Sequence, residues 1–189
     1  VESLVAAFEP GIAAVGGKLV PNQELLQTSW FAQAHQLRDQ INYTEPDKPV
    51  SGHEGLNVAG TANVAYRRSV LDEVGGFDES FPLAAGEDAD LQRRVIAAGH
   101  KMKYVPIIVR HNDEYRWKSF ISRAIRSGEG THHFHQKHSE PRSMLRILAG
   151  LVGSPIYFPS ALQQSHDPIV ASLYVIERML SRWGELRAP

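Results

Sequence analysis

The chain has 189 residues, a formal net charge of −1 and 42% hydrophobic residues, a composition typical of a soluble globular protein with a core of its own. Its near-neutral charge excludes the basic surface of a nucleic-acid-binding protein, so we predict no nucleic-acid partner. It has no cysteine, which excludes disulfides and thiolate metal sites and fits the reducing cytoplasm. The sequence shows neither a leader peptide nor an apolar run of membrane-spanning length, and its start without Met indicates a fragment. We therefore expect a cytoplasmic location, at most against the inner face of the membrane.

The first 42 residues predict a helix, a strand and a second helix. Apolar residues at positions 1, 4, 5 and 8 recur at helical spacing before the first proline. The apolar, glycine-containing run from Ile12 to Val20 predicts a buried strand. Asn22 is a suitable N-cap for one long helix over residues 22–41, in which Trp30 and Phe31 are expected to lie in the core.

The next 24 residues predict a loop and an interrupted strand. Two prolines and mixed charges between Tyr43 and Glu54 predict a solvated loop, with His53 and Glu54 as alternative substrate contacts. The strand-like run from Leu56 to Tyr66 is interrupted at Gly60-Thr61, where small residues would let a sugar or diphosphate approach the backbone. A simple β-bulge explains the same interruption equally well.

A short helix is predicted over Ser69–Val74, because Gly75-Gly76 follows it as a C-terminal stop. Phe77 is expected to anchor this turn in the core. Asp78 and Glu79 are interpreted as braces of the following loop, since acidic side chains commonly bond to turn backbone.

Three carboxylates, Glu87, Asp88 and Asp90, then stand within four residues at the start of a predicted helix. A carboxylate in the first helical turn is held ionised by unpaired N–H groups and the helix dipole. Such a group often only caps the helix, but on a rigid element at the rim of a core it also suits a general base.

Helical periodicity distributes these side chains between two faces. Asp88 shares a face with Leu91 and Val95, so it is expected to point toward the buried side. Asp90, together with Arg93 and Arg94, is expected to face solvent. After Gly99, two strands are predicted around Pro106, over residues 101–105 and 107–111.

Four motifs stand in this order between residues 58 and 111. They are Val58-Ala59-Gly60-Thr61-Ala62-Asn63, Val74-Gly75-Gly76-Phe77-Asp78-Glu79, Gly86-Glu87-Asp88-Ala89-Asp90, and the run from Ala98 to Pro106 followed by Val109-Arg110-His111. In this order and spacing they resemble the acceptor half of family 2 glycosyltransferases, which have the GT-A fold. The resemblance covers residues 1–130 and implies an α/β, Rossmann-like fold, with residues 131–189 as a helical C-terminal extension.

The resemblance also implies a function. It predicts inverting transfer of a sugar from a nucleotide-diphosphate donor to a hydroxyl acceptor, which could be a saccharide, a lipid or another molecule. Asp88 would be the general base, and Glu87 would orient the loop or bond to the acceptor. Gly60, Thr61 and Asn63 would line the substrate cleft.

A divalent metal, Mn²⁺ or Mg²⁺, is the cofactor that the resemblance implies. In similar enzymes an acidic loop holds the metal and the diphosphate, and this loop would lie before residue 1. His111 is the candidate metal ligand within the chain, although a lone His at a strand end is usually only a surface residue. Most of the nucleotide-binding half would then be missing.

Two other functions remain open at this stage. A glycoside hydrolase needs two carboxylates flanking the bond, and the consecutive Glu87 and Asp88 point about 100° apart on a helix. The chain could also be a non-catalytic fragment of a larger enzyme that binds an acceptor or another carbohydrate.

The last 73 residues predict helices. One helix is expected over Trp117–Ser127, with Gly128 and Gly130 as its stop. The four histidines that follow are interpreted as a solvated loop or helix end, since their spacing matches no standard zinc site; they are His132, His133, His135 and His138.

The final predicted helix spans Ile169–Leu186, with Asp167 as N-cap and Pro168 in the first turn. Its apolar stripe is Ile169, Leu173, Ile176, Leu180 and Trp183. Packing against its own domain is the default. Its arginines make it the candidate for a peripheral membrane contact.

Overall fold

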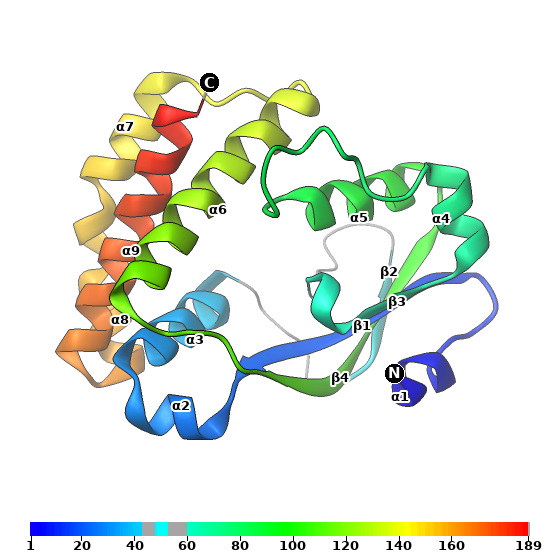
Figure 1. Ribbon diagram of the computed structural model, residues 1–189, viewed down its shortest axis with the longest axis horizontal. Coiled ribbons are helices and arrows are strands. Elements are labelled where there is room, and N and C mark those ends of the chain that lie inside the picture. The colour runs from blue at the N-terminus through cyan, green and yellow to red at the C-terminus, as the bar shows by residue number, and fades with distance from the viewer. Residues whose placement is uncertain (43–47, 53–59, 189) are drawn as a thin grey trace. The chain divides into compact units, whose positions relative to one another are not determined.

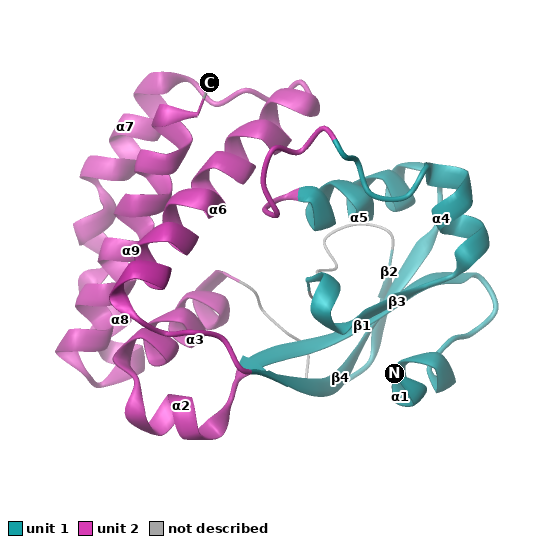
Figure 2. Ribbon diagram, in the orientation of Figure 1, with its two compact units in different colours: residues 1–20, 43–79, 87–111 teal, residues 21–42, 80–86, 112–189 magenta. Residues whose placement is uncertain are grey.

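The computed structural model describes residues 1–42, 48–52 and 60–188. The chain forms two compact units, coloured separately in Figure 2. Unit 1 comprises residues 1–20, 43–79 and 87–111, and unit 2 comprises residues 21–42, 80–86 and 112–189. The boundary predicted at residue 130 falls inside a helix of unit 2, α6 (Trp117–Lys137).

Unit 1 is built on a β-sheet (Figure 1). Its described strands are β1 (Ile12–Pro21), β2 (Val50–Gly52), β3 (Val64–Tyr66) and β4 (Lys101–His111). Their order in the sheet is β2-β4-β1-β3. β3 runs antiparallel to β1, with Tyr66 opposite Ala14, and β2 runs antiparallel to β4, with Val50 opposite Tyr104.

Helices pack against this sheet through two separate clusters of apolar side chains. The helices α4 (Arg68–Val74) and α5 (Glu87–Ala97) share one cluster with Ala14, Met102 and Tyr104. The helix α1 (Glu2–Ala6) joins the other through Leu4. Because both clusters draw on β1, that strand is apolar and buried nearly throughout rather than alternating, as predicted for residues 12–20.

Other predictions for unit 1 have mixed outcomes. The helix ending at Gly75 is confirmed, since Gly75 adopts a left-handed conformation with φ of 81°. The two strands predicted around Pro106 are one strand, β4, and the described residues of β2 pair with Met102 to Tyr104, short of Pro106. Phe77 is exposed, so its predicted place in the core is wrong.

Unit 2 begins with two helices where one was predicted, α2 (Gln23–Thr28) and α3 (Trp30–Asn42). Asn22 caps α2 as predicted, because its side chain accepts a hydrogen bond from the Glu24 N–H. Ser29 is extended and accepts from the Ala32 N–H, so it breaks the helix and starts the next one. Phe31 packs on the core, but Trp30 is exposed, contrary to the prediction.

The helix α6 does not stop at its glycines. It continues to Lys137, so all but the last of the four histidines lie within its final turns, and His138 is its C-cap. Gly128 and Gly130 are buried where another backbone passes close by. A methyl group on Gly128 would lie 1.8 Å from the Ser181 carbonyl oxygen, and one on Gly130 would lie 2.2 Å from that of Ala85.

The remaining elements of unit 2 are α7 (Met144–Val152), η2 (Ser154–Tyr157), α8 (Phe158–Ser165) and α9 (Pro168–Arg187). Asp167 caps α9 through the N–H groups of Ile169 and Val170, as predicted. No single helix in residues 1–42, 48–52 and 60–188 is long and apolar enough to cross a membrane. α7 and residues 154–165, bent by 50°, reach that length and composition only as a pair.

The buried surface of α9 is wider than the predicted stripe. It packs against α3, α6, α7 and α8, as Figure 1 shows, and is therefore surrounded. Ile169 and Trp183 on the stripe are exposed, whereas Glu177 and Glu185 off the stripe are buried. Glu177 accepts a hydrogen bond of 2.7 Å from Arg38 of α3, which accounts for its burial. The α/β fold with C-terminal helices is thus confirmed, but several helix faces differ from those expected.

Candidate functional site

The candidate site lies in unit 1, at the N-terminus of α5. The turn before it depends on Gly86, whose φ of 90° strongly favours glycine. Glu87, Asp88 and Asp90 all belong to the first turn of α5, as the sequence predicts. Their environments differ, so the three carboxylates can have different chemical roles.

Asp88 is half-buried and faces Gly60. Its Oδ1 accepts a hydrogen bond of 2.8 Å from the Ala89 N–H, which fixes the carboxylate at the helix start. A methyl group on Gly60 would lie 3.1 Å from Oδ2 of Asp88, so a larger side chain there would press on the carboxylate. Two residues predicted separately from the sequence therefore meet, 28 positions apart in the chain.

Tyr66, the last residue of β3, belongs to the same environment. Burial raises the pKa of its hydroxyl well above the ordinary value, the negative charge of Asp88 raises it further, and Arg94 acts in the opposite direction. The hydroxyl therefore stays protonated across the physiological range. It can donate a hydrogen bond but cannot compete with Asp88 as a base.

Glu87 has one unsatisfied atom. Its Oε2 is buried and has no hydrogen-bond partner among the described residues. A buried carboxylate oxygen without a donor is unfavourable, and a ligand hydroxyl would supply that donor.

The prediction that Asp90 faces solvent is wrong. It is fully buried and binds Arg94 with a 2.8 Å hydrogen bond from Nε to Oδ2. Arg94 also donates to the carbonyl oxygens of Val74 and Gly76, at 2.6 and 2.7 Å. Since α5 packs against α4 as well as the sheet, its buried surface is wide enough to include Asp90 and Arg94. The bonds of Arg94 tie α5 to the turn at Gly75-Gly76.

The other cleft candidates lie on η1 (Thr61–Asn63). Asn63 is buried, and its amide nitrogen donates to the carbonyl oxygens of Lys18 and Ile107 at 3.0 and 2.9 Å. It thereby ties η1 to both β1 and β4. Thr61 is exposed. Substrate contacts by either residue stay predictions, and His53 and Glu54 lie outside the described residues.

His111 is exposed at the end of β4. In the part of the chain that the structure describes, no group of three or more His, Asp or Glu side chains could hold a metal ion. The expected site combines His111 with an acidic loop before residue 1, so the described residues contain only one of its predicted ligands. The metal cofactor stays a prediction.

Comparison with known proteins decides the family. The model of the family described as "Glycosyltransferase like family 2" matches residues 1–130. The chain belongs to this family. The match includes every candidate site residue and ends within α6, whereas most of unit 2 lies beyond it.

The family 2 chain is similar to curated glycosyltransferases. It is 29% identical over 151 residues to the pre-mycofactocin glycosyltransferase of Mycobacterium tuberculosis, covering 79% of this chain and 31% of the relative. It is 30% identical over 136 residues to the O-antigen chain rhamnosyltransferase RfbN of Salmonella typhimurium, covering 68% of this chain and 41% of that protein. The chain thus spans less than half the length of these relatives. No solved structure matches it.

Two residues of the candidate site were not predicted from the sequence. Tyr66 ends a strand 22 residues before Asp88, and only the sheet register brings it to the helix start. Arg94 was placed on a solvent face, although the spacing of Asp90 and Arg94 (i, i+4) is that of an ion pair. That spacing was the one signal available before the structure.

Proposed function

We propose that this chain is the acceptor-side part of an inverting glycosyltransferase, which moves a sugar from a nucleotide-diphosphate donor to a hydroxyl acceptor. Family membership and the named activities of the relatives support sugar transfer. The proposal that Asp88 is the general base rests on its position. Its carboxylate is held at the N-terminus of α5 and faces Gly60.

In the proposed reaction, Asp88 accepts the proton of the attacking hydroxyl group. The acceptor oxygen forms a bond to the anomeric carbon from the face opposite the leaving group. The bond from that carbon to the diphosphate oxygen breaks, and its electron pair leaves with the diphosphate. One displacement of this kind inverts the configuration.

Neighbouring side chains have supporting roles in this proposal. Oε2 of Glu87 accepts a hydrogen bond from a second acceptor hydroxyl, which would satisfy its buried oxygen. Tyr66 stays protonated, and it lies near enough to Asp88 for that negative charge to raise its pKa. We assign no step to a divalent metal, because the described residues do not gather a set of ligands.

The alternative of a glycoside hydrolase is weaker. Asp90 is the third carboxylate of this turn, and its buried ion pair with Arg94 occupies it structurally. Glu87 and Asp88 are consecutive, so they do not flank a substrate bond from two sides.

The proposal is tested by incubating the intact natural protein with UDP-, GDP- and dTDP-sugars, with and without Mn²⁺. Thermal shift identifies the donor, and NMR of the transfer product gives its anomeric configuration. We expect stabilisation by one nucleotide class and a product with the configuration opposite to the donor. Retained configuration, or sugar release to water alone, would contradict the proposal.

A further inference from the structure

Unit 2 exposes a run of large apolar side chains on α7 and η2. Met144, Leu145, Val152 and Ile156 are 68%, 78%, 77% and 78% exposed. At about 100° per residue, positions 145, 148 and 152 lie within roughly 60° of one another on α7. Ile147, on another face of α7, is buried in the unit. Contiguous exposed apolar side chains of this kind usually mark an interaction surface.

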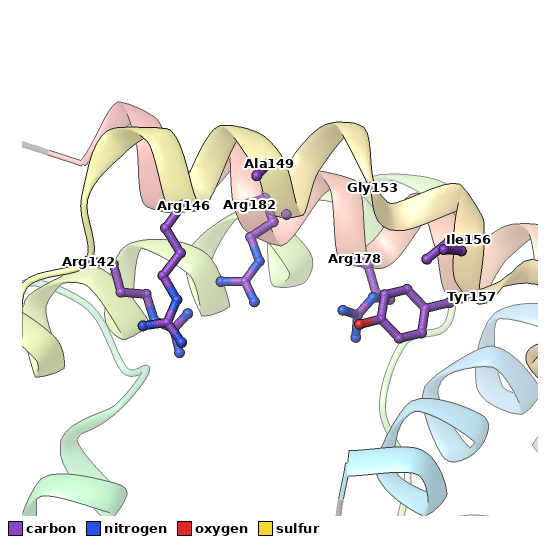
Figure 3. A pocket seen from close by; sticks show the side chains of 9 residues that line it. Arg142, Arg146, Ala149, Gly153, Ile156, Tyr157, Arg178 and Arg182 are labelled. Atoms are coloured by element: carbon purple, nitrogen blue, oxygen red, sulfur yellow. The ribbon is translucent and has the colours of Figure 1, made fainter.

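A pocket of about 300 Å³ adjoins this apolar surface. Four arginines line it, two from residues 142–146 and two from α9, and Figure 3 shows their side chains extending to the same side of α7. They are Arg142, Arg146, Arg178 and Arg182. Ile156 lines the pocket and is also part of the exposed apolar run, so the two features meet at η2.

The arginine pocket holds more positive charge than the nearby Glu185 carboxylate neutralises. Arg142 and Arg182 both pair with buried Glu185, at 3.3 and 2.5 Å. Arg146 and Arg178 have no ion pair among the described residues, and the Arg178 guanidinium lies 3.9 Å from the centroid of the Tyr157 ring. Four guanidinium groups line the pocket, and its lining includes no carboxylate.

One further detail agrees with a site for an anion. Nε of Arg178 is buried without a hydrogen-bond acceptor in the described part of the chain. A bound anion would supply that acceptor.

We propose that α7, η2 and the arginine pocket form a surface that binds a membrane containing anionic phospholipid. The exposed apolar side chains enter the boundary between headgroups and acyl chains, and one lipid phosphate occupies the arginine pocket. Arginine binds phosphate oxygens in paired hydrogen bonds, and each basic side chain near an anionic surface strengthens attachment. An amphipathic helix that lies in the interface combines these two contributions.

The two halves of this surface together favour a lipid over other partners. A soluble phosphate would use the arginines but leave the apolar side chains in water. A second copy of the chain, joined about a two-fold axis, would bring like-charged arginines toward each other at their shared interface. Anionic phospholipid offers an apolar region and a phosphate side by side.

The membrane proposal is independent of the sugar-transfer proposal, since vesicle binding does not require activity. Co-sedimentation of the intact protein with vesicles of phosphatidylcholine alone, and of phosphatidylcholine mixed with phosphatidylglycerol, tests it directly. We expect at least about tenfold stronger binding to the mixed vesicles, weakened by high salt. Equal binding to both, or no binding to either, would overturn the proposal.

Matched variants separate this surface from general electrostatic attraction. Arg146→Glu should lower binding to mixed vesicles by about tenfold or more. Arg126→Glu, an exposed site on α6 outside the pocket, makes the same charge change and should lower binding much less. Equal losses in the two variants would overturn the assignment to the pocket.

A second pair of variants tests the apolar side chains. Leu145→Glu combined with Val152→Glu should abolish vesicle binding, whereas Val5→Glu on α1 should not. If the double variant instead converts a dimer to a monomer by light scattering, without vesicle binding by the wild type, the surface is a contact between copies. If inorganic pyrophosphate binds the pocket and vesicles do not, the pocket takes a soluble anion, and the membrane proposal fails.

Discussion

At the scale of single residues, the three carboxylates of α5 are chemically alike but structurally different. Asp88 lies half-buried against Gly60, Glu87 keeps a buried oxygen without a partner, and Asp90 is locked to Arg94. Local sequence predicts that acidic side chains begin this helix. It does not predict which of them is buried, because that depends on α4 packing against α5 from outside the local segment.

Asp90 is therefore expected to matter for stability. Asp90→Asn removes the buried charge that pairs with the partly buried Arg94, so we expect a loss of about 3 kcal/mol in the free energy of unfolding. Urea denaturation followed by circular dichroism measures it. Asp72→Asn is the control, since Asp72 pairs with Arg68 in an exposed ion pair on α4 and should cost about 0.5 kcal/mol or less. Similar losses in both variants would contradict the structural role of Asp90.

At the scale of elements, glycines allow two helices to cross with their backbones in close contact. The predicted stop at Gly128 followed the usual preference of glycine for helix ends. In the structure, Gly128 and Gly184 are where α6 and α9 approach each other, since a methyl group on Gly184 would lie 2.1 Å from the Ile125 carbonyl oxygen. Gly128 therefore lies inside a helix, because α9, far away in the sequence, packs closely against it, whereas its local sequence predicts a helix end.

Gly128→Ala tests this crossing. The added methyl group would lie 1.8 Å from the Ser181 carbonyl oxygen, so α6 and α9 must separate. We expect a loss of about 2 kcal/mol or more in unfolding free energy, despite the higher helix propensity of alanine. Ser122→Ala on the exposed face of α6 is the control and should change stability by less than about 0.5 kcal/mol. A stabilised Gly128→Ala variant would show that the helices are not in close contact.

At the scale of the whole molecule, acid stability should depend on buried ion pairs. Burial alone would raise the pKa of Glu177, but Arg38 and His35 more than offset it, so the pKa lies below its ordinary value. A carboxyl group whose pKa is lowered by folding stabilises the protein above its unfolded pKa of about 4.3. That contribution is lost as pH falls through the lower, folded value.

Glu177→Gln removes this pair, which joins α9 to α3. We expect a loss of about 3 kcal/mol near neutral pH, because Arg38 loses its buried partner. Below about pH 4, the stability of the variant should fall less steeply with acid than that of the wild type. Thermal unfolding over a pH series measures both effects, with exposed Glu24→Gln as control. Parallel pH profiles for wild type and Glu177→Gln would exclude this role.

The sequence predicted the family and the α/β class of the whole chain from four ordered motifs, and it placed Asp88 and Gly60 in one site. It did not predict Tyr66 as their neighbour, or the exposed apolar surface beside the arginines of unit 2. Both depend on contacts between segments far apart in the chain. Local periodicity carries no information on such contacts.

The most direct test of the central claim is the single-turnover rate of sugar transfer by Asp88→Asn in the intact protein. The amide keeps the shape of the side chain but cannot accept the proton, so we predict a fall in rate of about 100-fold or more. Donor binding and thermal stability should stay as in the wild type, and Asp72→Asn should transfer at the wild-type rate. Transfer by Asp88→Asn within about threefold of the wild-type rate would contradict the assignment of Asp88 as the general base.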